Sequence, residues 1–199
     1  MIDNENNKDS DIKVKLLLIG NTFVGKTLIV QKFIDEKFAK QTMNTVGVEL
    51  QSKVVEVNGK KVKYLIWDTA GQDRMKTMAY SYYRGCDIIL IVFDVHERSS
   101  FGAISTWVEC VEKFAKPTAL KVLVGNKIDL PDRNITTDEG KKLAEDYGFE
   151  YYEISALKLQ GLKEMFEDIA KIYIKEYELR SAKIFSLDLN QTKKRKGCC

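Results

Sequence analysis

Short, almost wholly apolar runs alternate along this chain with longer segments in which apolar residues recur at helical spacing. Residues 88–93 and 122–124 are apolar throughout, which is typical of strands buried on both faces of a parallel sheet. Residues 13–19 predict a first strand and residues 149–154 a last one. The segments with helical spacing predict helices over about 26–36, 99–115, 137–147 and 162–177.

The dipeptide Asn58-Gly59 separates two β-type runs, 49–57 and 61–67, and therefore predicts a hairpin. Adding this hairpin to the buried runs gives a six-stranded, mostly parallel sheet with one antiparallel edge strand. The intervening helices are expected to cover both faces, so we expect one doubly wound α/β domain. Ligands of such sheets bind at the carboxyl ends of the strands, where the polar motifs of this chain lie.

The turn after the first predicted strand, Gly20 to Thr27, has the spacing of a phosphate-binding loop. Its glycines let successive N–H groups face one anion, and the start of the following helix adds partial positive charge. Lys26 can then reach the outer phosphates, and the Thr27 hydroxyl can bind Mg²⁺. A glycine-containing turn with a solvated lysine is the alternative. The residues expected to contact nucleotide here are Thr22, Phe23, Val24, Gly25, Lys26, Thr27 and Leu28.

Asp68, Gly71 and Gln72 follow the strand that ends near Trp67. A carboxylate directly after a buried strand is destabilising unless it meets a cation, and a metal-bound water near Thr27 would satisfy Asp68. Gly71 lets its N–H approach a terminal phosphate closely. Gln72 has both a donor and an acceptor, so it can orient a water without being a strong base. The alternative is a capped turn before a helix.

A further polar motif, Asn126-Lys127-Ile128-Asp129, follows the strand at 122–124. An ionised Asp129 only accepts hydrogen bonds; guanine presents two adjacent N–H donors to such a carboxylate, whereas adenine presents no matching pair. Asn126 is expected to brace the loop, and the alkyl stem of Lys127 to cover the base face. After the last strand, the backbone that can reach the guanine carbonyl belongs to Ser155, Ala156 and Leu157.

Thr45 lies in a polar connection between the first helix and the hairpin. Its hydroxyl can complete the Mg²⁺ shell only while the terminal phosphate is present, which makes this loop a candidate order–disorder switch. An ordinary surface threonine is the alternative.

Composition narrows the class of protein. The net charge is +3 over 199 residues, so no global field points to a nucleic-acid partner. No run approaches the roughly 18 apolar residues of a membrane span, and the polar residues 1–11 predict a disordered N-terminus rather than a secretory signal. Cys86 and Cys110 lie in apolar segments without a disulfide pattern, which favours a reducing compartment. His96 has no cluster of ligands around it, so we expect a loop residue and no zinc site.

The chain ends in a basic run, residues 193–196, followed by the paired cysteines Cys198 and Cys199. Each cation near an anionic membrane surface contributes about 1 kcal/mol, which is too little for durable binding. Two lipid chains give stable anchoring where one gives marginal binding. We therefore expect both cysteines to be prenylated at the end of a flexible tail, residues 179–199. A solvated basic tail with free thiols is the alternative.

Together these motifs resemble those of small GTPases of the Ras superfamily, and of the Rab family within it. The resemblance covers about residues 12–178, which it implies form one GTP-binding domain. The superfamily motifs are Gly20 to Thr27, Thr45, Asp68 to Gly71, Asn126 to Asp129 and Ser155-Ala156. The Rab-like features are Val46 to Glu49, Trp67 to Gln72, Tyr82 to Gly85 and the terminal cysteine pair.

The resemblance implies a switch that cycles between GDP and GTP and hydrolyses GTP by positioning and charge stabilisation. Thr27 and Thr45 are implied to bind Mg²⁺, and Asp68 to hold it through water. Phe38 matches the position that packs on the guanine face, and Gln72 the one that positions the attacking water.

The same resemblance implies partners and a place in the cell. No arginine of this chain has an obvious role as an arginine finger, so a GTPase-activating protein is expected to supply one. An exchange factor is expected to release GDP. Effectors, a prenylation escort protein and a GDP-dissociation inhibitor are the other expected partners. The prenylated tail implies the cytoplasmic face of intracellular membranes, with a cytosolic pool, and a role in vesicle trafficking.

Several positions depart from the Rab pattern, including Asp73, Met75 and Leu157 and the three that follow. Phe23 stands where a small residue is usual, and Thr42 replaces an aromatic residue. Leu50 replaces one aromatic of a partner-facing triad, whose other members would be Trp67 and Tyr82.

Two other functions stay open from the sequence. An ATP-using phosphotransferase could use the same phosphate loop, but Asp129 argues against it. A nucleotide-locked binding module would bind without hydrolysis, but Gln72 argues against that.

Overall fold

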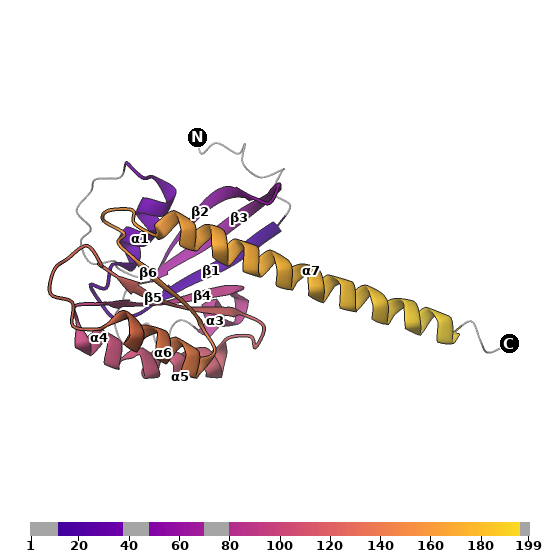
Figure 1. Ribbon diagram of the computed structural model, residues 1–199. Helices are drawn as coiled ribbons and strands as arrows, with labels where there is room; N and C mark the ends of the chain where they lie inside the picture. Colours follow the sequence, from indigo (N-terminus) through magenta and orange to yellow (C-terminus); the bar gives the residue numbers. More distant parts are fainter. Residues whose placement is uncertain (1–11, 38–47, 70–79, 196–199) are drawn as a thin grey trace.

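The computed structural model describes residues 12–37, 48–69 and 80–195, with the backbone alone over 183–195. These residues form a six-stranded sheet of order β2-β3-β1-β4-β5-β6 with helices on both faces (Figure 1). The strands are β1 (Ile12–Ile19), β2 (Val48–Val57), β3 (Lys60–Thr69), β4 (Ile88–Asp94), β5 (Leu120–Asn126) and β6 (Glu150–Ile154). The helices are α1 (Lys26–Ile34), α3 (Tyr80–Gly85), α4 (Arg98–Gly102), α5 (Ile104–Phe114), α6 (Thr137–Tyr147) and α7 (Leu162–Arg195).

The pairing of the strands confirms the predicted fold. β1 pairs in parallel with β3 and β4, and the pairs β4–β5 and β5–β6 are also parallel. β2 runs antiparallel to β3 across Asn58 and Gly59, whose φ angles are 52° and 72°. Positive φ at both central positions is what a tight two-residue hairpin turn requires, so β2 is the antiparallel edge strand that the sequence predicts.

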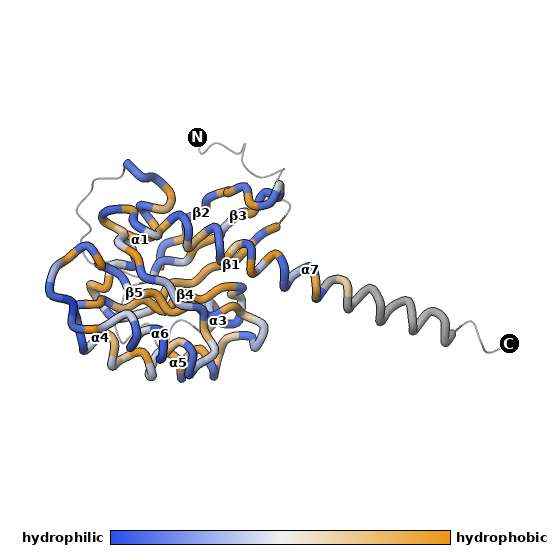
Figure 2. Tube along the Cα trace, in the orientation of Figure 1, coloured by the Kyte–Doolittle hydropathy of each residue, from blue (hydrophilic) through white to orange (hydrophobic). Residues whose placement is uncertain are grey.

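The inner strands bury both of their faces. All seven residues of β4 are buried, because alternate side chains point to opposite sides of the sheet. The even-numbered apolar residues of β4 pack under α1 and α7, and the odd-numbered ones pack under α5 and α6. Figure 2 shows the apolar strands at the centre, between two layers of helices with polar outer positions.

The predicted helix over 99–115 is two helices in the structure. Ala103, with φ of −78° and ψ of −6°, is the last flanking residue of α4 and the first of α5. The backbone N–H of Ala103 donates to the Ser99 carbonyl at 3.1 Å, so the interruption between α4 and α5 is short. The apolar residues of α5 pack against the sheet.

α7 is longer than predicted and continues to Arg195 instead of ending near 177. Arg180 donates to the Thr118 carbonyl at 2.9 Å, and Lys60 pairs with Glu178. These contacts hold the helix against both flanks of the domain, and beyond them it extends away from the sheet (Figure 1). Among the described residues no helix is both long and apolar enough to cross a membrane. The division into a GTP-binding domain and a tail remains a prediction.

Candidate functional site

The phosphate loop joins the carboxyl end of β1 to the start of α1. Gly25 is the N-cap of α1 with φ of 96° and has no capping side chain, so the first N–H groups of the helix are left for an anion. A Cβ on Gly25 would lie 2.4 Å from Nδ2 of Asn126, and one on Gly20 would lie 2.1 Å from the Val92 carbonyl oxygen. Both positions therefore require glycine, as expected of a loop that closes around phosphate.

Lys26 places its ammonium inside this loop. The side chain is 5% exposed, and Nζ donates to the carbonyls of Gly20 and Asn21 at 2.9 and 2.8 Å. Burial lowers the pKa of Lys26 to about 8, against the opposing effect of the nearby Asp68 carboxylate. An anion bound in the loop would favour the charged form, so Lys26 is suited to hold phosphate.

Asp68 is fully buried on β3, beside β1 in register with Leu18. Among the described residues neither carboxylate oxygen has a hydrogen-bond partner of good geometry. Burial raises the pKa of Asp68, while the Thr27 hydroxyl and then the Lys26 ammonium oppose that rise. A buried carboxylate without a close partner is destabilising unless a cation meets it, so this part of the site calls for a cation.

Asp68 and a nearby hydroxyl are the groups in this part of the site that could hold Mg²⁺. In the described ranges no three or more His, Cys, Asp or Glu side chains gather where they could hold a metal. Mg²⁺ is usually bound through one or two protein oxygens together with phosphates and waters. Asp68 and the Thr27 hydroxyl offer such oxygens next to the phosphate loop.

Asn126 connects three loops at the carboxyl edge of the sheet. Its side chain is 1% exposed, and Nδ2 donates to the Val24 carbonyl at 2.9 Å. Its Oδ1 accepts the backbone N–H of Ala156 at 3.1 Å. The predicted bracing role of Asn126 is therefore present as two hydrogen bonds, one to the phosphate loop and one to the loop after β6.

Asp129 lies beside a small cavity at this edge. One carboxylate oxygen accepts the Ser155 hydroxyl at 2.6 Å, and that hydroxyl oxygen accepts the backbone N–H of Lys158 at 2.9 Å. The cavity has a volume of about 120 Å³. Its lining residues are Gly25, Leu28, Asn126, Lys127, Asp129, Leu130 and Leu157. Apolar walls with a carboxylate among them are what a purine base that presents N–H donors requires.

Lys127 has a left-handed φ of 71°, and its ammonium pairs with Asp94 at 2.6 Å. That pairing directs the alkyl stem along the cavity that Lys127 lines, which agrees with a stem that covers one face of a base. Sequence reasoning missed Asp94, although its place at the end of a wholly buried strand, like that of Asp68, was an available signal.

Trp107 is a further residue whose role the sequence did not reveal. Its place on the apolar stripe of α5 predicts a core residue, and it is 3% exposed. Its Nε1 also donates to Oδ1 of Asn21 at 2.9 Å, so α5 holds the phosphate loop at the residue whose carbonyl accepts from Lys26.

Phe23 has a left-handed φ of 66° and is 75% exposed. Its ring therefore projects from the phosphate loop and does not need space within it. Glycine would suit this backbone conformation better, because a Cβ in the left-handed region is unfavourable.

The aromatic triad implied by the Rab resemblance is a surface cluster. Leu50 lies opposite Trp67 in the β2–β3 pairing and is 58% exposed. The rings of Trp67 and Tyr82 lie 6.2 Å apart. Leu50 thus stands where an aromatic residue is usual, and the cluster has a smaller apolar surface than one with three aromatic side chains.

Several predicted site residues lie outside the described ranges. They are Phe38, Thr45, Gly71, Gln72, Cys198 and Cys199. Residues 1–11 and Thr42 are also outside them.

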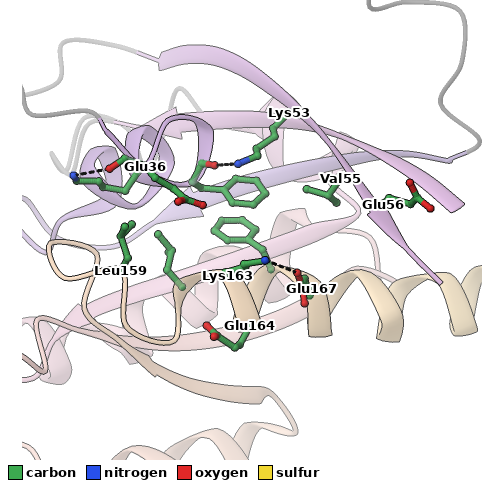
Figure 3. Close-up of a pocket in the computed structure, with 12 residues that line it drawn as sticks. Glu36, Lys53, Val55, Glu56, Leu159, Lys163, Glu164 and Glu167 are labelled. Atoms are coloured by element: carbon green, nitrogen blue, oxygen red, sulfur yellow. Dashed lines mark hydrogen bonds and ion pairs between the residues drawn. The ribbon is translucent and has the colours of Figure 1, made fainter. Parts of the chain in front are cut away.

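A second and larger cavity, of about 420 Å³, lies between α1, β2 and the start of α7 (Figure 3). The stacked rings of Phe33 and Phe166, with centroids 3.6 Å apart, line it. Lysine and glutamate side chains surround the opening, and Lys53 donates to the Phe33 carbonyl. It shares no lining residue with the cavity at the strand ends, so the larger volume does not coincide with the candidate site.

Comparison with known proteins identifies the family of the chain. The Ras family model matches residues 15–175 of the chain. Ras-related protein RABE1e of Arabidopsis thaliana is 41% identical over 165 residues, which are 82% of this chain and 76% of that protein. Two proteins of Saccharomyces cerevisiae, Ras-related protein SEC4 and GTP-binding protein YPT1, are each 40% identical. Their alignments cover 84% and 83% of this chain and 78% and 81% of the relatives.

The chain belongs to the Ras family of small GTPases, within which its relatives are Rab proteins. It is a Rab-like GTPase that binds guanine nucleotide, hydrolyses GTP and acts in vesicle trafficking. The family, the fold and the enzyme class predicted from the motifs are thereby confirmed.

Proposed function

We propose that the chain binds Mg²⁺ together with GTP or GDP at the carboxyl ends of β1, β3 and β5. The observation that carries this proposal is that one cavity is lined both by Gly25 of the phosphate loop and by Asp129 of the guanine motif. A nucleotide that spans the two has its phosphates at the start of α1 and its base against Asp129.

The phosphate end assigns a role to each buried polar group. Lys26 binds the outer phosphates, and Thr27 with Asp68 holds Mg²⁺, which supplies positive charge to the phosphate oxygens. Thr45 completes the metal shell in the GTP state. Gly71 contacts the terminal phosphate and Gln72 orients the attacking water. Because water attacks directly, no residue forms a covalent intermediate.

The base end assigns specificity to Asp129, which accepts both guanine N–H groups. The Ser155 hydroxyl, 2.6 Å from one Asp129 oxygen, holds the carboxylate in place. Lys127 and Phe38 cover the two faces of the base, and the backbone of Ala156 and Leu157 approaches its carbonyl. A site built to pair with specific N–H groups rejects an analogue that lacks them by on the order of 10⁴-fold or more.

The partners follow from the switch and the tail. An exchange factor, a GTPase-activating protein and effectors act on the nucleotide-dependent surface, where Leu50 is exposed beside the half-buried rings of Trp67 and Tyr82. Prenylation of Cys198 and Cys199 by an escort-dependent route anchors the protein to the cytoplasmic face of intracellular membranes. A GDP-dissociation inhibitor type of protein maintains the cytosolic pool.

Thermal unfolding with Mg²⁺ and either GDP or ADP tests the nucleotide assignment. We expect GDP to raise the unfolding temperature and ADP at the same concentration to leave it unchanged. Single-turnover hydrolysis of GTP tests the chemistry, since Gln72→Leu should slow hydrolysis while leaving GTP binding intact. Equal protection by GDP and ADP, or a Gln72→Leu rate equal to that of the unmodified chain, would contradict the proposal.

A further inference from the structure

The imidazole of His96 lies between the carbonyl oxygens of two residues that flank Asp129. Its Nε2 is 3.2 Å from the Lys127 carbonyl oxygen, and its Nδ1 is 3.3 Å from that of Asp132. Lys127 and Asp132 both have left-handed backbones, with φ of 71° and 59°. The ring therefore contacts two residues with unfavourable backbone conformations, one on each side of Asp129, which is the residue proposed to bind the base.

The backbone around His96 is fixed to the same loop. Its N–H donates to the Asp94 carboxylate at 3.0 Å, and its carbonyl accepts the side-chain amide of Asn134 at 2.6 Å. The Val95 carbonyl accepts the backbone N–H groups of Asn134 and Ile135, each at 3.0 Å. Since the backbone cannot shift freely, the position of the ring between the two carbonyls is imposed by the turn.

The contacts of the ring depend on its protonation. A carbonyl oxygen only accepts, and a neutral imidazole has one N–H donor and one acceptor nitrogen. A neutral ring can therefore satisfy one of the two carbonyls and opposes the other with a lone pair. The imidazolium donates from both nitrogens, and imidazole is the side chain whose charge ordinarily changes between about pH 5 and 8.

Most of the charged side chains on the elements around His96 form ion pairs or cap a helix. Asp94 at the end of β4 pairs with Lys127 of the loop after β5. Arg98 at the start of α4 pairs with Glu139 of α6 at 2.6 Å. Glu97 caps α4 through the Ser99 N–H, and Asp132 contacts the ring through its backbone carbonyl.

We propose that His96 is a positioning residue of the guanine site, whose protonated ring fastens Lys127 and Asp132 and thereby slows nucleotide release. The proposal rests on the proposed guanine site, because it acts through the loop that presents Asp129. His96 itself does not line the cavity at the base end. It acts on the nucleotide through the backbone of that loop.

Release of a fluorescent GDP analogue from the Mg²⁺-loaded full chain, measured between pH 5.5 and 8, tests the proposal. We expect release to be about threefold to tenfold slower at the acidic end, since one hydrogen bond to the ring is gained there. His96→Ala and His96→Asn should release the analogue at a rate that does not change over this range. Asp146→Asn, at an exposed position of α6 away from the His96 turn, is the control and should keep the pH dependence.

Two results overturn the proposal. One is a pH dependence in His96→Ala and His96→Asn equal to that of the unmodified chain, and the other is an unmodified chain with no pH dependence. His96 is the chain's one histidine, so its ring nitrogens give one assignable pair of NMR signals. Two ring N–H protons protected in the acidic GDP complex support the proposal, and one protected proton at every pH contradicts it. If no complex forms with GDP, the proposed guanine site fails as well, whereas a complex with unaltered pH behaviour removes the role of His96 alone.

Discussion

The side-chain amide of Asn126 donates to the Val24 carbonyl at 2.9 Å and so joins two loops that are 102 positions apart in the chain. In the function we propose, one of these loops binds phosphate and the other binds the base. Because the other end of the Asn126 amide accepts the Ala156 N–H, one buried side chain sets the spacing of three segments of the proposed site. We therefore expect binding of phosphate and recognition of the base to be coupled through Asn126.

Asn126→Ala should weaken GDP binding although the residue carries no charge. The change leaves the Val24 carbonyl and the Ala156 N–H buried without their partner, and each such group costs on the order of 1–3 kcal/mol. We expect GDP to dissociate at least tenfold faster and the unfolding temperature to fall. A variant that folds, keeps its unfolding temperature and releases GDP at the original rate would show that Asn126 does not set the spacing.

Asp68→Asn should have opposite effects on the nucleotide-free and the nucleotide-bound protein. The carboxylate is fully buried without a good hydrogen-bond partner among the described residues, so its neutral analogue should stabilise the nucleotide-free protein by on the order of 1 kcal/mol. The same change should remove the dependence of GDP affinity on Mg²⁺. Asp87→Asn breaks an ion pair with Lys116 and serves as control, since it should destabilise the protein and keep the Mg²⁺ dependence. Retention of that dependence in Asp68→Asn would exclude Asp68 from the metal site.

The buried ammonium of Lys26 should give the nucleotide-free protein a stability that rises with pH. Burial lowers the pKa of Lys26 from about 10.5 to about 8. The unfolded chain then binds more protons between these values, so the free energy of unfolding increases from about pH 8 to about pH 10.5. Chemical denaturation in the presence of a chelator, at several pH values, measures this increase.

Lys26→Met isolates that contribution from those of other groups. The difference in unfolding free energy between the variant and the unmodified chain should be largest below about pH 8 and shrink by on the order of 3 kcal/mol toward pH 10.5. Lys37→Met removes an exposed lysine that follows α1 and serves as the control for loss of a surface charge. A constant difference for Lys26→Met would mean that the ammonium is not destabilised by burial.

Truncation within α7 should separate stability from membrane binding. Tyr173 and Ile174 are 7% and 5% exposed, so a chain that ends at Lys171 should lose several kcal/mol of stability, about 2–5 for each large buried side chain. A chain that ends at Lys183 keeps the contacts of Arg180 and should unfold within about 0.5 kcal/mol of the full chain. In cells, the second truncation should nevertheless abolish sedimentation with membranes. Persistent sedimentation would place the anchor elsewhere in the protein.

The fold was predictable where burial imposes a local pattern. β4 is buried along its whole length, and such a run has few interpretations in a chain of this size. Asn58 and Gly59 specify a hairpin because few residues adopt positive φ. The burial of Asp68 was predictable as well, because this residue comes at the end of an apolar strand, while its role at a cation stays a prediction.

The rest of the site depends on contacts that leave no local trace in the sequence. The hydrogen bond from Trp107 to Asn21 connects residues that are 86 positions apart. A tryptophan on an apolar stripe predicts only a core residue. The sequence indicates only a loop residue at His96. Its two contacts could not be predicted, because the carbonyls that face the ring belong to a different loop. The extension of α7 was missed for the same reason, since Arg180 and Glu178 are stabilised by partners outside the helix.

The affinity of Asp129→Asn for guanine and xanthine nucleotides tests the central claim most directly. Calorimetry of the nucleotide-free protein with Mg²⁺ and either GDP or xanthosine diphosphate measures both affinities. The new amide can donate where the carboxylate could only accept, so GDP affinity should fall by about 10²-fold or more while xanthosine diphosphate affinity rises. Asp146→Asn makes the same chemical change at an exposed position of α6 and should leave both affinities as they are. Undiminished GDP affinity in Asp129→Asn would contradict the account.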